Sequence, residues 1–159
     1  MRGLILIVDD NPIDLKLTSA LLGVKGFEVE AAVDAEQAQL LLRRMVPDLM
    51  VVDIALPGMD GLTLTRLIKG DPRLAHVPVV ALTAFAKRGD EEQAAAAGCE
   101  RYFTKPIDIK SFADDIARTL AASVSRAALR CWPAWSRKRF TLRAAWRMRC
   151  SFSTRPMRT

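Results

Sequence analysis

The feature that most constrains the fold is an alternation of short apolar runs with longer amphipathic stretches, repeated five times between residues 3 and 122. The first run, Leu4–Val8, is apolar at every position, which is typical of a strand buried on both faces of a parallel sheet. Five consecutive strand–helix units predict an α/β fold, a doubly wound five-stranded parallel sheet with right-handed crossovers and helices on both faces.

Turn and capping residues set the expected limits of these elements. Strands are predicted over Leu4–Val8, Phe27–Val33, Leu49–Asp53, Pro78–Leu82 and Arg101–Thr104. The first three helices are predicted from Pro12 to a cap at Gly26, from a cap at Asp34 to Met45, and over Leu62–Lys69. The fourth is an alanine-rich helix that ends at Gly98. The fifth follows a cap at Asp108, and its apolar stripe is Ile109, Phe112, Ile116 and Leu120.

Polar residues stand at the carboxyl ends of four predicted strands, where ligands bind in open parallel sheets. They are Asp9 and Asp10, Asp53, Thr83 with Ala84, and Lys105 before Pro106. Three carboxylates brought together repel one another and need a cation, and a hard divalent ion such as Mg2+ takes oxygen ligands of this kind.

The same residues indicate phosphoryl chemistry at Asp53. An aspartate can form an aspartyl-phosphate when position and metal activate it, and Lys105 and Thr83 offer a charge and a hydroxyl to phosphoryl oxygens, with room left by Ala84. Each residue alone also suits a polar turn, a helix cap or a solvated loop charge. A metal-dependent hydrolase of external phosphate esters fits less well, because no separate general base is evident.

Four motifs carry a resemblance to a known family over residues 3–122. They are Ile7–Asn11, Asp53–Gly61, Leu82–Ala84 and Tyr102–Pro106, in this order and spacing. The segment resembles the receiver domain of response regulators, the CheY-like family with a flavodoxin-like fold. The run from Thr83 to Glu91, with Gly98–Glu100, is most similar to single-domain cell-cycle regulators of the DivK type.

The resemblance implies a role for each matching residue. Asp53 would accept a phosphoryl group from a phosphohistidine on a sensor histidine kinase or histidine phosphotransfer protein. Mg2+ would be held by Asp9, Asp10, Asp53 and the backbone carbonyl of Ala55. Thr83, Ala84 and Lys105 would surround the phosphoryl group, the bond before Pro106 would be cis, and Thr83 with Tyr102 would form a switch that presents a surface to a downstream protein target. Self-phosphorylation and self-dephosphorylation would be the only catalysis.

Charge divides the chain into two kinds of sequence near Ser123. Residues 1–123 carry all 18 acidic residues and a net charge of −4, whereas residues 124–159 carry +10 and all three tryptophans. We therefore expect a receiver domain over 1–123 and a basic tail over 124–159, either disordered or adventitious. The alternative is a regulator whose tail binds nucleic acid or an anionic membrane as its output.

The compartment is predicted from what the sequence lacks. No apolar run is long enough for a membrane span, and no signal-peptide pattern precedes Leu4. Cys99, Cys131 and Cys150 have no spacing typical of a zinc site or a disulfide framework. We expect a cytoplasmic protein with reduced thiols.

Overall fold

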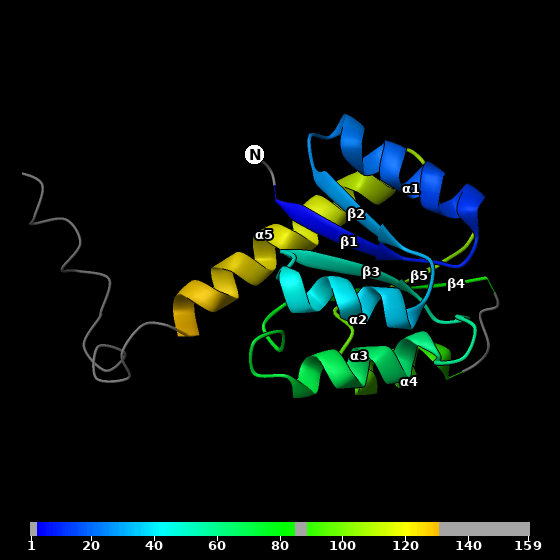
Figure 1. Cartoon of the computed structure of the whole chain (residues 1–159). Helices are drawn as coiled ribbons and strands as arrows, with labels where there is room; N and C mark the ends of the chain where they lie inside the picture. Colours follow the sequence, from blue (N-terminus) through cyan, green and yellow to red (C-terminus); the bar gives the residue numbers. More distant parts are fainter. Residues whose placement is uncertain (1–2, 85–88, 131–159) are drawn as a thin grey trace, which may run out of the picture. The chain divides into compact units, whose positions relative to one another are not determined.

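The computed structural model describes residues 3–84 and 89–130 of the 159-residue chain, with side chains described as far as Ser125. Five strands alternate with five helices in this part of the chain (Figure 1): β1 (Leu4–Val8), α1 (Pro12–Val24), β2 (Glu28–Ala32), α2 (Ala35–Arg44), β3 (Leu49–Asp53), α3 (Gly61–Gly70), β4 (Val79–Thr83), α4 (Asp90–Ala97), β5 (Arg101–Thr104) and α5 (Phe112–Arg130). The predicted α/β fold is confirmed.

All strand pairs are parallel, and the strand order is β2-β1-β3-β4-β5. The chain direction across the sheet reverses between β1 and β3, which is the switch point where doubly wound sheets bind ligands. The register pairs Val8 with Val52 and Asp53 with Leu82. The residues that follow β1 and β3 therefore leave the sheet side by side.

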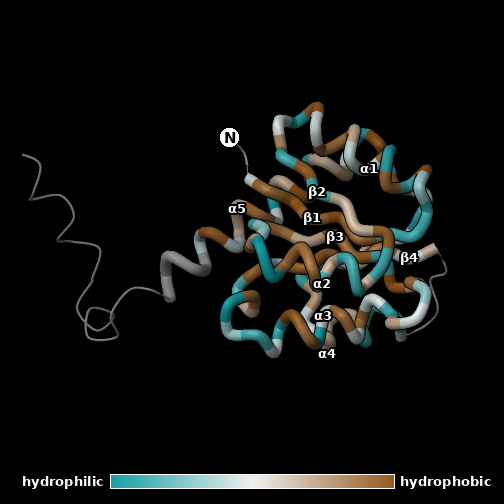
Figure 2. Tube along the Cα trace, in the orientation of Figure 1, coloured by the Kyte–Doolittle hydropathy of each residue, from teal (hydrophilic) through white to brown (hydrophobic). Residues whose placement is uncertain are grey.

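Helices cover both faces of the sheet, with α1 and α5 on one face and α2, α3 and α4 on the other (Figure 1). In β1, Ile5 and Ile7 pack against α1 and α5, while Leu6 and Val8 pack against the opposite layer. Each fully buried side chain of this size contributes roughly 1.5–3 kcal/mol. The central strands β1, β3 and β4 form a hydrophobic layer between the helices (Figure 2), which fixes the polar strand ends in place.

Side-chain caps determine where the helices begin. Asp34, the predicted cap of α2, accepts a hydrogen bond from the Gln37 N–H at 2.7 Å. Asp60 caps α3 in the same way, through the Thr63 N–H at 2.9 Å, and this cap was not predicted. Gly26 and Gly98 have φ of +85° and +99°, the left-handed conformation predicted after α1 and α4.

The start of α5 differs from the prediction. Ile109 is 59% exposed and does not belong to the apolar stripe, whereas Phe112 and Ile116 are buried. The reason is local, because Asp108 accepts hydrogen bonds from the Lys110 N–H and the Ser111 hydroxyl and so closes a turn before the helix. The helix itself begins only at Phe112.

The C-terminal boundary remains a prediction. The chain divides into two units, and the compact first unit, Met1–Ser125, contains the whole sheet. The helix α5 continues beyond this boundary to Arg130. Residues 131–159, which make up most of the predicted basic tail, lie outside the described residues. None of the helices within the described residues is long and apolar enough to cross a membrane.

Candidate functional site

Three aspartates meet at the switch point between β1 and β3. Asp9 follows β1, Asp10 comes next, and Asp53 is the last residue of β3. One carboxylate oxygen from each lies within 4.8 Å of the others. Asp9 and Asp53 are buried while Asp10 is exposed, so the cluster is open to solvent at the side where Asp10 lies.

Lys105 reaches this cluster from the end of β5. Its Nζ lies 2.7 Å from Asp9 Oδ2 and 2.7 Å from Asp53 Oδ2. Burial acts to lower the pKa of Lys105, but the hydrogen bonds to Asp53, Asp9 and Asp14 outweigh it and raise that pKa, so the ammonium stays charged. The peptide bond between Lys105 and Pro106 is cis.

Asp14 is a fourth carboxylate at the site, and sequence reasoning missed it. It lies in the first turn of α1, and its Oδ2 is 2.9 Å from Lys105 Nζ. Its position in the first turn of a helix that leaves the same sheet edge places Asp14 near that edge, but the spacing alone does not determine which way its side chain faces.

The two buried carboxylates are held in the same way. Asp9 Oδ1 accepts the Asn11 N–H at 2.9 Å, and Asp53 Oδ1 accepts the Ala55 N–H at 3.0 Å. The other oxygen of each carboxylate contacts Lys105. Gly61, at the start of α3, allows this packing, because a Cβ there would overlap the backbone carbonyl of Asp53.

The charge at the site favours a cation. Four carboxylates face one ammonium, which leaves three negative charges uncompensated when all groups are ionised. Burial raises the pKa of the Asp9 carboxyl, and the hydrogen bond from Lys105 only partly opposes this. An all-oxygen set with one solvent-facing member suits Mg2+, which keeps several waters and takes few carboxylates.

The remaining predicted residues lie on β4 and β5. Thr83 ends β4 next to β3, it is buried, and its carbonyl accepts the Lys105 N–H at 2.7 Å. Ala84 follows it and is exposed. Tyr102 is not part of the carboxylate cluster, because it packs against the hydrophobic cluster that includes Ala81 and Ala94.

The Tyr102 hydroxyl is buried and makes no hydrogen bond to any residue that the structure describes. Burial, and next the Asp90 carboxylate, raise the pKa of this phenol, while the nearby Thr83 hydroxyl acts in the opposite direction. The two predicted switch residues are therefore neighbours.

Comparisons with known proteins agree with this geometry. Residues 5–117 match the model of the response regulator receiver domain family. The polar-differentiation response regulator DivK of Brucella ovis is 41% identical over 116 residues, which cover 73% of this chain and 94% of that protein.

Two solved structures are also similar. The receiver domain of a signal transduction histidine kinase from Syntrophus aciditrophicus superposes with a TM-score of 0.70 at 32% identity, covering 76% of this chain and 91% of that one. A putative response regulator from Chloroflexus aurantiacus gives a TM-score of 0.72 at 28% identity, with 75% and 98% covered. The family match, the similar proteins and the aspartate cluster at the predicted sheet edge agree with one another. The chain belongs to the response regulator receiver domain family, as a receiver of a two-component system.

Proposed function

We propose that Asp53 is the phosphoryl acceptor of this receiver and that a phosphohistidine on a sensor histidine kinase or histidine phosphotransfer protein is the donor. The observation that carries the proposal is the Asp53 carboxylate itself, buried at the end of β3 and oriented by the Ala55 N–H and Lys105. It stands beside two further aspartates that can share a cation with it.

Asp9, Asp10 and Asp53 would hold Mg2+, together with the backbone carbonyl of Ala55. The ion would neutralise charge on the carboxylates and on the phosphoryl oxygens, which is its usual contribution to phosphoryl transfer. Removing Asp10 would cost affinity, because it supplies one of the three carboxylate oxygens that lie close enough to share the ion.

In the transfer, an Asp53 carboxylate oxygen forms a bond to phosphorus as the bond between phosphorus and the donor imidazole nitrogen breaks. The electron pair of that bond stays on the imidazole nitrogen. A ring protonated at its other nitrogen leaves as neutral imidazole, and an unprotonated ring takes up one proton from water. Lys105 and Thr83, at the ends of β5 and β4, would bind phosphoryl oxygens, with Ala84 leaving space beside them. Hydrolysis of the acyl phosphate by water restores the Asp53 carboxylate and releases phosphate.

The output would be a change at β4 and β5. Movement of Thr83 toward the phosphoryl group would vacate space near Tyr102, whose buried hydroxyl has no partner among the described residues. Such a switch is a population shift, so the phosphoryl group must bind one state better by a few kcal/mol. The altered surface would bind a downstream protein target in the cytoplasm.

The test uses acetyl phosphate and Mg2+ with intact-mass measurement. We expect one added phosphoryl group, absent after Asp53→Asn and after removal of Mg2+. Asp48→Asn is the matched control, because Asp48 lies just before β3, at the opposite end of the strand, and is exposed. Labelling of Asp53→Asn at the same rate as the parent would refute the assignment.

A further inference from the structure

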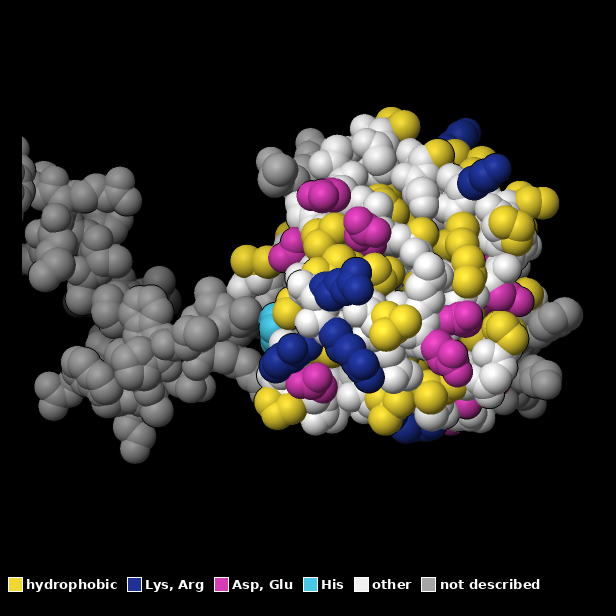
Figure 3. Space-filling model, in the orientation of Figure 1, with side chains coloured by type: hydrophobic (Ala, Val, Ile, Leu, Met, Phe, Trp, Pro, Cys, Tyr) yellow, Lys and Arg dark blue, Asp and Glu magenta, His cyan; other side chains and the backbone are white. Residues whose placement is uncertain are grey.

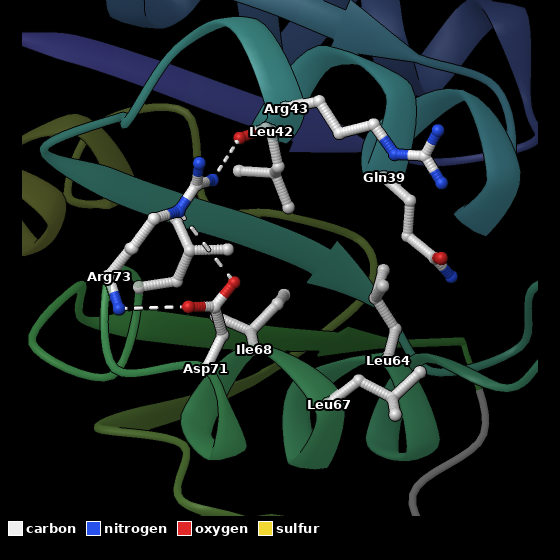
Figure 4. A pocket seen from close by; sticks show the side chains of 9 residues that line it. Gln39, Leu42, Arg43, Leu64, Leu67, Ile68, Asp71 and Arg73 are labelled. Atoms are coloured by element: carbon white, nitrogen blue, oxygen red, sulfur yellow. Dashed lines mark hydrogen bonds and ion pairs between the residues drawn. The ribbon is translucent and has the colours of Figure 1, made fainter.

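A groove lies between α2 and α3, on the face of the sheet that also carries α4. It encloses about 210 Å3, less than the roughly 300–1,000 Å3 of a small-molecule site. Its floor is apolar and includes Leu42 and Ile68. Leu67 lines it as well, although 52% of this side chain is exposed. Figure 4 shows these side chains between the two helices.

Two arginines stand at the rim of this groove (Figure 4). Arg73 is fixed in place, since its Nη2 donates to the Leu42 carbonyl at 2.9 Å and its Nε lies 3.9 Å from Asp71 Oδ2. Arg43 is exposed and forms no hydrogen bond or ion pair with other described residues. The groove is therefore lined by two cations and one anion, whereas residues 1–123 together are negative.

The C-terminal position of Arg43 in α2 has a simple structural benefit, because a cation there interacts favourably with the helix dipole. That benefit accounts for the charge of Arg43 but not for the exposed Leu67, which lines the same groove from α3. Figure 3 shows Lys and Arg side chains near one another on this face of the molecule, with hydrophobic side chains and some Asp and Glu around them. An apolar groove with cations at its rim is complementary to an apolar stripe flanked by carboxylates.

We propose that the α2–α3 groove binds an amphipathic helix of a partner protein, with one or two apolar side chains in the groove and an acidic side chain on Arg43. The chain's own tail does not fit, because residues 124–159 contain no acid. A two-fold pairing through the same groove does not fit either, because it would bring the arginines of both copies together. The concave shape and the small volume favour a helix over a flat membrane surface.

The groove lies away from the phosphoryl-acceptor site. The helix α3 begins beside Asp53, where the Gly61 N–H donates to the Ile54 carbonyl. The groove is lined by later residues of this helix, Leu64, Leu67 and Ile68. A partner helix could therefore stay bound while a kinase reaches Asp53. This separation allows docking and phosphorylation to be measured independently.

The test is a titration of the full 15N-labelled chain with a synthetic helical peptide of Glu, Leu and Ala, in which Leu recurs at i and i+4 with Glu on either side. We expect NMR shifts clustered on α2 and α3. Arg43→Glu and Leu67→Ser should each weaken binding about tenfold or more, as central contact residues do. The matched control is Arg44→Glu, because Arg44 is exposed in the same helix turn but does not line the groove, and it should change the affinity by no more than about twofold.

Three results would overturn the proposal: no binding at millimolar peptide, equal losses for Arg43→Glu and Arg44→Glu, or equal binding of a peptide with Lys in place of Glu. Light scattering of the chain alone would also overturn it if a dimer appeared that Arg43→Glu abolished, because the occupant would then be a second copy. All variants should still accept a phosphoryl group at Asp53, and this readout separates failure of the groove from failure of the proposed function.

Discussion

Replacing Lys105 with Met should destabilise the metal-free protein, because three carboxylates share this ammonium. Its Nζ lies 2.7 Å from Asp9 and Asp53 and 2.9 Å from Asp14, and only 12% of the Lys105 side chain is exposed. Removing one partner of a buried ion pair costs about 3–5 kcal/mol. Methionine keeps much of the apolar length of lysine, so the loss reports mainly on charge.

The magnitude has an upper limit set by protonation. A carboxyl with an ordinary pKa can escape the repulsion by binding a proton, at a cost of about 4 kcal/mol at pH 7. The cost is smaller for Asp9, because burial already raises its pKa. We therefore expect Lys105→Met to lower the free energy of unfolding by about 2–4 kcal/mol at pH 7 without metal.

Mg2+ should close much of this gap. A divalent ion bound by the aspartates supplies the charge that the ammonium supplied, and without repulsion from that ammonium it should bind Lys105→Met more tightly than the parent. A tenfold lower Kd closes about 1.4 kcal/mol of the gap at saturation. Urea unfolding with EDTA and with saturating Mg2+ measures both states. Lys16→Met is the control, because Lys16 is exposed on α1, and it should change stability by less than about 0.5 kcal/mol in either condition. An equal deficit with and without Mg2+ would refute the view that one cation replaces the other.

Three further predictions concern the metal, a helix cap and the tail. Asp10→Ala should weaken Mg2+ binding in calorimetry more than Asp48→Ala does, and equal affinities would count against the cluster as the metal site. Asp60→Ala should cost about 1 kcal/mol, as loss of an N-cap does, with Asp60→Asn closer to the parent. Burial acts to raise the pKa of Asp60, but the hydrogen bonds from the Thr63 N–H and hydroxyl outweigh it and lower that pKa. The stabilisation by Asp60 should therefore be complete above its pKa in the unfolded chain and should be lost as the pH falls through its pKa in the folded protein. A cost of Asp60→Ala that does not shrink in acid would contradict this. Deleting residues 124–159 should leave the melting temperature and Asp53 phosphorylation unchanged, because Leu120 is the last α5 side chain, among those described, that packs on the hydrophobic core. A loss of several degrees would show that the tail docks on the domain.

The strand ends were predictable because a parallel sheet brings them to one edge whatever the helices do. Asp9, Asp10, Asp53 and Lys105 meet there as the pattern indicated. The role of Asp14 was not predictable in the same way. Its direction depends on the rotation of α1, which is set by the burial of Leu15, Thr18 and Leu22 against the sheet and not by local spacing alone.

Other features depend on contacts that a linear pattern does not contain. Gly61 reads as one more glycine in a loop, and only the approach of α3 to the Asp53 carbonyl shows why a Cβ does not fit there. The prediction for Ile109 was wrong. Its apolar spacing continues the pattern of the helix, but residues 109–111 form a turn that the hydrogen bonds to Asp108 stabilise, and Ile109 is exposed there. The groove likewise arises from the distance between α2 and α3, two helices that pack on neighbouring strands.

The arrangement of charges suggests why a phosphoryl group on Asp53 would act on one face and not on the other. The Lys105 ammonium contacts Asp9, Asp14 and Asp53. If it moved to bind the oxygens of a phosphoryl group on Asp53, its contacts with Asp9 and Asp14 would weaken. Its backbone N–H is bonded to the Thr83 carbonyl, so a displacement of either residue strains the ends of β4 and β5 together. The Tyr102 hydroxyl, which has no hydrogen-bond partner among the described residues, lies nearby on β5. At the α2–α3 groove the described contacts of Arg73 run to the Leu42 carbonyl and to Asp71, and neither residue belongs to the aspartate cluster. We therefore expect its affinity for an acidic helix to be the same with and without beryllofluoride, a mimic of the phosphoryl group, while the shifts that beryllofluoride causes appear around Thr83 and Tyr102.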